Sequence, residues 1–398
     1  MKNNNWQIKY LKDLCIQAGE YGLNAPAISF TKEFPLYLRI TDITDDGIYS
    51  DKQRVSVAYT GTEKLLNNND FLFARTGATV GKTYLNRQTD EKIAFAGYLI
   101  RFVPDLNKIL PYYLVLYCQT KPYWKWVKIF SIRSGQPGIS AEEYGKLPIP
   151  CPPIEEQRRI VEVLECWDKG IELVKKLIEQ KELQKKYLMQ QLLSGVLRLK
   201  GFTQKWGKKP LGKLITLYQG YPFKSETYSA QGHYKIITIA NVKQGYLDLA
   251  KFSTIQVLPP DILNYQQLDV GDILISMTGN VGRVCLVNSK NCLLNQRVGK
   301  IEANLLNKEF LFYILQLPDF LNVMLACAQG GAQANLSTKD IYHYVLFYPS
   351  DAREQQAIAE VLSSADKEID LLKQKLAKLE AQKKGLMQVL LTGKIRLK

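Results

Sequence analysis

The sequence is poor in the side chains that most enzymes use for chemistry. Its 398 residues include only two histidines, His233 and His343, and seven cysteines that form no Cys-x-x-Cys pair. We therefore expect no zinc site, and we interpret each histidine as structural. A nuclease needs clustered carboxylates with a lysine to hold its metal, and no Pro-Asp pair here is followed by a nearby Glu-x-Lys. We predict that the chain has no catalytic residue and no metal ligand.

Cofactor-binding motifs are missing as well. A phosphate loop would need glycine where the chain has Thr76, although Gly81-Lys82-Thr83 follows at the right distance. An adenine methyltransferase would need a glycine-rich cofactor loop and an Asn/Asp-Pro-Pro-aromatic motif, and both Pro-Pro pairs of the chain have the wrong neighbours. We find no serine-nucleophile elbow either. These gaps exclude several enzyme classes and favour a protein that binds.

Long apolar runs are also lacking. No uninterrupted apolar run of about 18 residues occurs, so we expect no membrane span and no membrane partner. Residues 1–10 are polar, which argues against a secretory signal. An odd number of cysteines without paired spacing fits a reduced protein with inert thiols. We therefore expect a cytoplasmic location.

Negative charge is in short supply, with 38 acidic against 53 basic residues and a formal net charge of +15. Segments 1–150, 151–200, 201–350 and 351–398 carry +5, +2, +5 and +3. A surplus of this size indicates a polyanionic partner, with a basic surface kept only for solubility as the alternative. Because the two long segments carry equal shares, two equivalent anion-binding bodies are expected.

The most informative feature is an internal duplication. Residues 156–200 align with residues 354–398 without a gap, at an offset of 198, and 24 of the 45 positions are identical. The segments ahead of each copy correspond more loosely: Trp6 and Trp206 open the two halves, and SGQPGIS lies where GGAQANLS lies in the second half. The order is therefore variable unit, similar helix, variable unit, similar helix, an internal pseudo-twofold repeat.

Each repeated segment has the periodicity of a coiled coil. Apolar residues recur every 3.5 residues over nearly five heptads, which favours pairing of the two helices over an ordinary amphipathic helix packed on its own domain. Lys181, Lys185 and Lys383 interrupt this pattern, as expected where the helices face water or another protein. The first helix should begin near Ile154, after PIPCPP, and Gly195 and Gly393 suit the C-cap position. The predicted seam consists of Ile160, Leu164, Trp167, Ile171, Val174, Ile178, Leu188 and Leu192, and of Ile358, Leu362, Ala365, Ile369, Leu372, Leu376, Leu379, Leu386 and Leu390.

The variable units have mixed α/β patterns. FLFARTG and ILISMTG are apolar runs that end in a Thr-Gly turn and lead into a second apolar run, which predicts a strand-turn-strand hairpin in each unit. PYYLVLYCQT and EFLFYILQL are typical of short buried helices. Two such units joined through long helices would contact two DNA half-sites separated by unread DNA.

Candidate DNA contacts lie in turns and loops of both units. The Thr-Gly turns offer backbone N–H groups and a basic side chain to phosphate; their residues are Arg75, Thr76, Gly77 and Lys82, and Thr278, Gly279, Asn280 and Arg283. Lys121, Lys125 and Lys128 form a basic helical stripe beside aromatic residues, for which a solvated face over an aromatic core is an equal alternative. Polar side chains suited to base edges are Arg133, Ser134 and Gln136, with Gln329, Gln333 and Asn335 in the matching loop. For any one of these, a plain surface loop remains the alternative.

Several of these segments resemble one known family. LPIPCPPIEEQRRIVEVL, LLSGVLRLK and LLTGKIRLK, together with the RTGATVGK and MTGNVGR turns, are similar to the specificity (S) subunits of type I restriction-modification systems, over essentially the whole chain. The resemblance implies two target-recognition domains, each reading half of a bipartite double-stranded DNA site, and an antiparallel coiled coil that binds two methyltransferase (M) subunits. It further implies that S-adenosylmethionine lies on the M subunits, and that restriction (R) subunits with ATP and Mg²⁺ join through M. This chain itself would hold no cofactor.

The resemblance also suggests where a partner binds. Glu156-Gln157 and Glu354-Gln355 match in both copies and are candidates for a shared partner surface, with helix N-terminal capping as the alternative. The second copy has YPSDAREQQ and lacks the prolines of the first, so the two helix entrances need not be equivalent. We predict target-recognition domains at 1–150 and 201–350, and helical regions at 151–200 and 351–398.

The sequence is compatible with three functions. The favoured one is a non-catalytic reader of an asymmetric, bipartite DNA site that also serves as an assembly scaffold. The others are a coiled-coil adaptor whose basic domains bind nucleic acid or a membrane surface without sequence preference, and a self-sufficient enzyme with an unfamiliar site. Because the two variable units differ, the two half-sites should differ as well.

Overall fold

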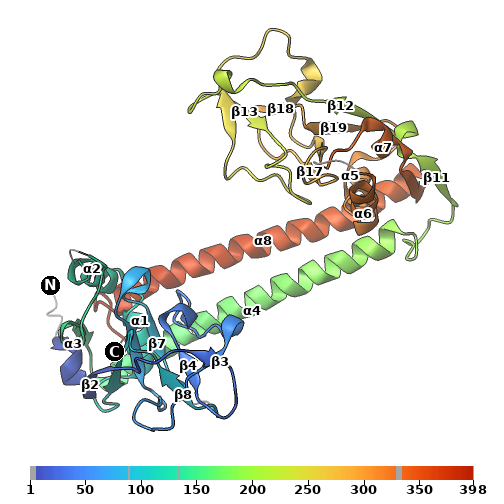
Figure 1. Ribbon diagram of the computed structural model, residues 1–398. Coiled ribbons are helices and arrows are strands. Elements are labelled where there is room, and N and C mark those ends of the chain that lie inside the picture. The colour runs from blue at the N-terminus through green and yellow to red at the C-terminus, as the bar shows by residue number, and fades with distance from the viewer. Residues whose placement is uncertain (1–5, 88–89, 133–134, 329–333, 398) are drawn as a thin grey trace. The chain divides into compact units, whose positions relative to one another are not determined.

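The chain divides into two compact units. Unit 1 contains residues 1–175 and 374–398, and unit 2 contains residues 176–373. The structure is a computed structural model that describes residues 6–87, 90–132, 135–328 and 334–397. Both units contain the predicted mixture of strands and helices (Figure 1).

Unit 1 contains two four-stranded sheets and one two-stranded ribbon. The first sheet has the order β2-β9-β6-β7, the second β3-β5-β4-β8, and the ribbon pairs β1 with β10. The strands are β1 (Gln7–Tyr10), β2 (Cys15–Tyr21), β3 (Ile28–Ser29), β4 (Leu36–Leu38), β5 (Val55–Ser56), β6 (Phe71–Ala74), β7 (Thr83–Leu85), β8 (Ile93–Phe95), β9 (Leu99–Pro104) and β10 (Pro148–Cys151). The helices that begin in this unit are α1 (Pro111–Tyr117), α2 (Lys121–Phe130), α3 (Ala141–Gly145) and α4 (Ile154–Leu193).

Unit 2 repeats the first sheet and the ribbon of unit 1, and its second sheet differs in one edge strand. Its sheets have the orders β12-β19-β16-β17 and β14-β13-β18-β15, and β11 pairs with β20. In both units the second sheet contains one parallel pair, β4 with β8 and β13 with β18. The strands are β11 (Trp206–Pro210), β12 (Ile215–Gln219), β13 (Tyr234–Ile237), β14 (Ser253–Ile255), β15 (Gln267–Leu268), β16 (Ile273–Ser276), β17 (Val284–Leu286), β18 (Cys292–Leu294), β19 (Val298–Ala303) and β20 (Val345–Pro349). The helices are α5 (Lys308–Ile314), α6 (Pro318–Cys327), α7 (Thr338–His343) and α8 (Ala352–Leu390).

The hairpins predicted around the Thr-Gly turns are confirmed. β6 pairs with β7, and β16 pairs with β17, in antiparallel register. Successive side chains of a strand face opposite sides, and both sides of β6 are covered: Phe71 and Phe73 enter the core beneath the helices, while Leu72 packs with the second sheet. A strand buried on both faces is expected to be apolar throughout, as the run FLFA is.

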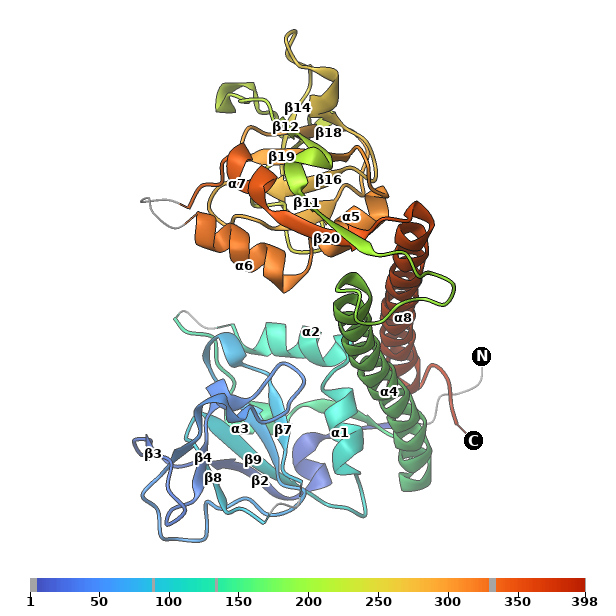
Figure 2. The same cartoon turned by 90° about the vertical axis from the view of Figure 1, so that its right-hand side faces the viewer.

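The two short buried helices are also confirmed as α1 and α5. In α1, Tyr113 and Leu114 are fully buried, and Phe310 and Leu311 are fully buried in α5. Figure 2 labels α1 beside β7 in unit 1, where these two elements are in contact. Each helix therefore covers the first sheet of its unit beside the hairpin.

In unit 1, the start of α4 packs against the end of α8. Ile160 and Leu164 share one core with Leu390, as the heptad pattern predicts. Lys383 forms an ion pair with Asp168, and Lys175 pairs with Glu380 at 3.0 Å. The residue number of the partner on α8 decreases from 383 to 380 as the residue number on α4 increases from 168 to 175, so the two helices run antiparallel.

In unit 2, the end of α4 packs against the start of α8 in the same way. Leu192 shares a core with Ile358 and Leu362. Lys181 pairs with Glu368 at 2.8 Å, and Lys185 with Asp366 at 2.5 Å. The expectation that the interrupting lysines face water or another protein is therefore corrected, because each lysine is paired with an acid of the opposite helix.

Both helices end at the predicted glycines. Gly195 and Gly393 have φ of +72° and +69°, the left-handed conformation that glycine adopts without a steric cost. The N–H of Leu197 bonds back to the carbonyl of Gln191, and that of Ile395 to the carbonyl of Val389. α4 begins at Ile154, as predicted from the proline run.

Candidate nucleic-acid interface

The Thr-Gly turns are tight loops held against the following helix. In unit 1, Gly81 has φ of +89°, and a Cβ there would lie 2.7 Å from Cγ1 of Val127 on α2. Tyr123 donates a hydrogen bond to the carbonyl of Gly81 at 2.6 Å. In unit 2, a Cβ at Gly282 would lie 2.7 Å from Cβ of Met324 on α6. Each turn leads into a strand and not into a helix, so it does not have the architecture of a phosphate loop.

The structure brings the second predicted loop to the turn in both units. In unit 1, the N–H of Gly77 donates to the carbonyl of Pro137 at 2.9 Å, and Ile139 donates to the carbonyl of Arg75 at 2.8 Å. Gln136, which precedes Pro137, is exposed. Arg133 and Ser134, also predicted in this loop, lie outside the described residues.

The equivalent bonds recur in unit 2. Gly279 donates to the carbonyl of Ala334 at 2.9 Å, and Leu336 donates to the carbonyl of Met277 at 2.8 Å. Asn335 is exposed and bridges to Thr278, as Gly138 bridges to Thr76 in unit 1. Gln329 and Gln333 lie outside the part of the chain that is described.

A third loop, which sequence reasoning missed, joins this cluster. The N–H of Arg75 donates to the carbonyl of Tyr98 at 3.0 Å, and that of Met277 donates to the carbonyl of Arg297 at 3.1 Å. Tyr98 and Arg297 precede β9 and β19, and both are exposed. The duplication could have revealed them, because Tyr98 lies 23 residues after Arg75 and Arg297 lies 20 residues after Met277, and Arg75 and Met277 directly follow β6 and β16. We call the three adjacent loops of each unit its loop cluster: residues 75–82, 96–98 and 135–140 in unit 1, and 277–283, 295–297 and 334–337 in unit 2.

The basic residues of the turns differ in their surroundings. The Lys82 ammonium lies 2.7 Å from the Asp45 carboxylate, which is 92% exposed, so water or a stronger anion can compete for it. Arg75 lies over the ring of Tyr21, with 4.8 Å between the guanidinium carbon and the ring centroid. The main chain of Arg283 is fixed by a hydrogen bond from its N–H to Oγ of Ser276 at 3.1 Å. Asn280 beside it is exposed.

The lysine stripe occurs only in unit 1. Lys121, Lys125 and Lys128 are exposed on α2, while Tyr123 and Trp126 on the same helix are buried. The helix thus presents a basic face to solvent above an aromatic core, which is compatible with both interpretations of the stripe. The corresponding helix of unit 2, α6, has the sequence PDFLNVMLAC and contains no cation.

Glu156 and Gln157 lie inside unit 1 and not on its surface. Glu156 accepts hydrogen bonds from Arg396 at 2.6 Å and from Nε1 of Trp6 at 3.2 Å. Burial raises the pKa of Glu156, but these hydrogen bonds outweigh it and hold the pKa below its ordinary value. Gln157 is fully buried and accepts a bond from the N–H of Leu110 at 2.9 Å.

Glu354 and Gln355 have the same environment in unit 2. Glu354 is fully buried and binds Arg198 and Nε1 of Trp206. Gln355 accepts a bond from the N–H of Asn307 at 2.8 Å. The two helix entrances are therefore equivalent despite the missing prolines. The expectation of a shared partner surface at these four positions is corrected, because each side chain is buried within its own unit.

A cleft of about 990 Å³ lies in unit 1 between the hairpin, α1 and the two long helices. Residues from α4 and α8 on its wall include Asp168, Lys175, Glu380, Lys383 and Lys384. Charges of both signs therefore line it, and no single sign dominates. Such a wall is more suited to a protein surface of mixed charge than to a polyanion.

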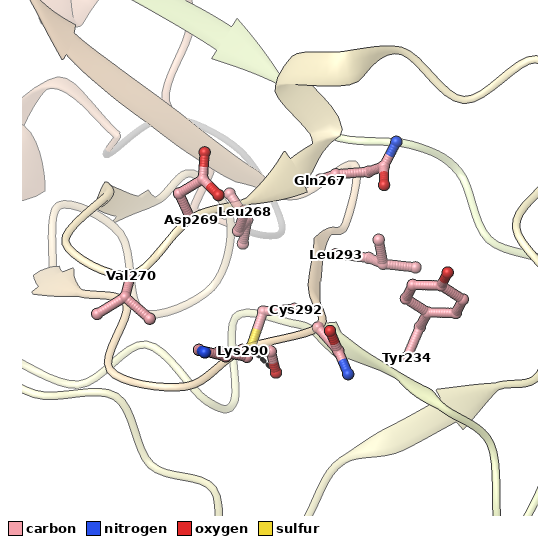
Figure 3. A pocket seen from close by; sticks show the side chains of 9 residues that line it. Tyr234, Gln267, Leu268, Asp269, Val270, Lys290, Cys292 and Leu293 are labelled. Carbon is pink, nitrogen blue, oxygen red and sulfur yellow. Dashed lines mark hydrogen bonds between the residues drawn. The ribbon is translucent and has the colours of Figure 1, made fainter.

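A smaller cavity of about 480 Å³ lies in unit 2 beside β13, β15 and β18 (Figure 3). Tyr234, Asp269, Lys290 and Cys292 line it. Burial raises the pKa of the Cys292 thiol, which therefore stays protonated at neutral pH. Across the described residues, no group of three or more His, Cys, Asp or Glu side chains is placed to hold a metal ion.

No single helix in the described part of the chain has both the length and the apolar character needed to cross a membrane. Among the described residues, α5 and α6 taken together have that length and composition, but these two helices are bent by 68° relative to each other.

A comparison with known protein families shows to which family the chain belongs. The family model of the type I restriction modification DNA specificity domain matches residues 3–183 and again residues 203–381. The chain belongs to this family. It is a type I specificity subunit with two tandem specificity domains, and subunits of this kind recognise DNA sequence and are non-catalytic. The resemblance found in the sequence is thereby confirmed.

Curated relatives agree with this assignment. The chain is 28% identical to the type I restriction enzyme MjaVIII specificity subunit of Methanocaldococcus jannaschii, over 94% of this chain and 89% of the relative. It is 27% identical to the putative MjaX specificity subunit of the same organism, over 99% and 94% of the two chains.

Solved structures show the same fold. The HsdS subunit of Thermoanaerobacter tengcongensis superposes with a TM-score of 0.54 at 18% identity and covers 98% of this chain and 97% of its own. A chain from a type I restriction-modification system, solved in a study of complex assembly and conformational transition, has a TM-score of 0.62 at 20% identity, with coverage of 97% and 96%. The S subunit from M. genitalium has a TM-score of 0.54 at 16% identity, with coverage of 98% and 97%.

Proposed function

We propose that this specificity subunit reads an interrupted, asymmetric site on double-stranded DNA, one half with each unit. The observation that carries the proposal is the loop cluster, which is built twice with the same backbone hydrogen bonds and with different exposed side chains. A common framework with different side chains is what two readers of different half-sites require, because base edges are distinguished by the side chains presented to them.

The charge of the chain supports DNA as the ligand. Positive charge is shared between the two variable segments, and the exposed lysines of α2 offer phosphate contacts beside the loop cluster of unit 1. Phosphate contacts position a protein on DNA, whereas base contacts specify the sequence. We assign the lysines to the first role and the loop clusters to the second.

The proposal includes partner subunits. Two methyltransferase subunits would bind the α4–α8 coiled coil, and restriction subunits would join through them. The mixed-charge cleft beside α4 and α8 in unit 1 supports a protein partner at this position. S-adenosylmethionine, ATP and Mg²⁺ would be held by these partners, and this chain would supply recognition alone.

Selection of DNA by the assembled complex tests the proposal. The chain is purified together with the methyltransferase subunit of its host and incubated with random double-stranded DNA at several salt concentrations, and bound DNA is sequenced. We expect enrichment of one interrupted sequence with two unlike halves. Binding without sequence preference, together with failure to recover a methyltransferase in the pull-down, would support a coiled-coil adaptor instead.

A further inference from the structure

The two loop clusters share a backbone arrangement but place their arginine on different loops. Each cluster has a central residue, Arg75 or Met277, whose N–H donates to the third loop and whose carbonyl accepts from the second. In unit 1 the central residue is arginine and its neighbour on the third loop is Tyr98. In unit 2 the central residue is methionine and the neighbour is Arg297. The arginine therefore lies on the first loop of the cluster in unit 1 and on the third loop in unit 2.

The two arginines also differ in what holds them. Arg75 is half-buried and its guanidinium lies over the Tyr21 ring. Arg297 is exposed, and within the described part of the chain its guanidinium has no hydrogen-bond or ion-pair partner. An arginine that supports the fold normally has an acceptor, as Arg101 does with Asp70 at 3.1 Å. Arg297 therefore has no structural role that the described contacts account for.

The main chain at Arg297 is nevertheless fixed. Its N–H donates to Oδ1 of Asn295 at 3.5 Å, and its carbonyl accepts from Met277 at 3.1 Å. The N–H of the preceding Gln296 donates to the carbonyl of Tyr221 at 3.0 Å. Because the main chain of Arg297 is fixed, its planar guanidinium is pre-organised for a directional contact with a ligand.

We propose that Arg297 reads a guanine in the half-site recognised by unit 2. The guanidinium fork donates two parallel hydrogen bonds to O6 and N7 of guanine, which is the commonest base-specific contact in protein–DNA complexes. Its surroundings fit base reading better than phosphate binding, because the other exposed side chains of the unit 2 loop cluster, among them Gln296, Asn280 and Asn335, are uncharged. Tyr98, at the equivalent place in unit 1, has no such fork, so this guanine contact belongs to the half-site of unit 2. The inference rests on the proposed DNA-reading function.

The test uses the full chain expressed with its methyltransferase subunit, and the methylated motif is mapped by sequencing. The wild-type motif should contain a guanine in one half-site that R297A no longer requires, with the other half-site unchanged. Discrimination against other bases at that position should fall about tenfold to a hundredfold. R297K keeps the charge but loses the fork, so it should lose discrimination as well. As a matched control, K251A removes an exposed cation of unit 2 that lies outside its loop cluster and should leave the motif unchanged.

Two results would overturn the assignment. One is a motif that R297A leaves fully specified, and the other is an R297K complex that still demands guanine, because a point charge would then suffice. Failure of the proposed function would look different, since the wild-type complex itself would then show no motif. Folding of each variant is checked by recovery of the methyltransferase in the pull-down and by methylation at the half-site of unit 1.

Discussion

Arg396 donates two hydrogen bonds of 2.6 Å to the carboxylate of Glu156, although 240 residues separate the two residues in the chain. Arg198 likewise donates two hydrogen bonds to the carboxylate of Glu354. Each arginine comes from the tail that follows one long helix, and each glutamate comes from the start of the other. Every sequence copy is therefore divided between the two units, with its beginning in one and its end in the other.

Loss of this contact should destabilise unit 1. We expect E156Q to lower the free energy of unfolding by about 2 kcal/mol, because it removes the buried charged acceptor of the hydrogen bonds from Arg396 and Trp6. The neighbouring E155Q provides the control: Glu155 is 65% exposed and pairs only with Arg158 on the same helix, so it should cost less than about 0.5 kcal/mol. Urea unfolding followed by circular dichroism measures both. Equal effects of the two substitutions would argue against a structural role of the buried pair.

Acid should weaken unit 2 through Asp272. Burial raises the pKa of this carboxyl, but hydrogen bonds from Lys300, at 2.6 Å, and from the N–H of Asp269 outweigh it and hold the pKa below its ordinary value. A group whose pKa is lowered on folding stabilises the fold above its unfolded pKa of about 3.9, and this contribution is lost as the pH falls through the folded pKa. We therefore expect stability to decline below about pH 4.

The variant D272N separates this contribution from that of other acids. It should be less stable than the wild type by about 2 kcal/mol at pH 7, because it leaves Lys300 without its charged partner. The difference should shrink as the pH falls below 4. D269N changes an exposed side chain of the same turn and should follow the wild-type pH curve. A D272N difference that is constant with pH would show that Asp272 does not titrate as described.

Two glycines of the first long-helix segment should respond to alanine with opposite signs. Gly170 lies inside α4 with open space around its Cβ position, so G170A should stabilise by about 0.5–1 kcal/mol. Gly195 has φ of +72°, and its Cβ would lie 3.3 Å from the Trp206 ring, so G195A should destabilise by about 1 kcal/mol. Thermal unfolding of both variants checks this. A stabilised G195A would contradict the left-handed cap.

The lysines of α2 should set the salt dependence of DNA binding without setting the sequence. Each lysine that neutralises a phosphate contributes about 0.9 to the slope of log K against log salt, so replacing Lys121, Lys125 and Lys128 by glutamine should reduce the slope by about 3. The methylated motif should not change. A control with K375Q and K378Q removes exposed charges of α8 and should leave the slope unaltered. An altered motif in the triple variant would assign base reading to α2.

Much of the fold was predictable because it depends on local patterns. The heptads of α4 and α8, the Thr-Gly hairpins and the capping glycines are each encoded within a few residues. The position of Glu156 and Glu354 was not predictable in this way: their burial depends on Arg396 and Arg198, which only tertiary folding brings to them. A Glu-Gln pair repeated in both sequence copies therefore suggested a partner surface where the structure has an interior.

The candidate site was predicted only in part for the same reason. The turns and the second loop were found because both carry polar or glycine-rich motifs. The third loop, with Tyr98 and Arg297, has the unlike sequences AGY and NQR in the two units, and its membership depends on backbone bonds across neighbouring strands. Lys82 was correctly placed on the turn, but its partner Asp45 comes from a loop that sequence spacing could not connect to it.

The central claim, that each unit reads its own half-site, is tested most directly by duplicating one unit. A chain in which residues 201–350 are replaced by a second copy of residues 1–150 is expressed with the methyltransferase subunit, and methylated adenines are mapped by sequencing. The account predicts an interrupted palindrome built from the half-site of unit 1. Methylation that remains at the original asymmetric site would contradict it.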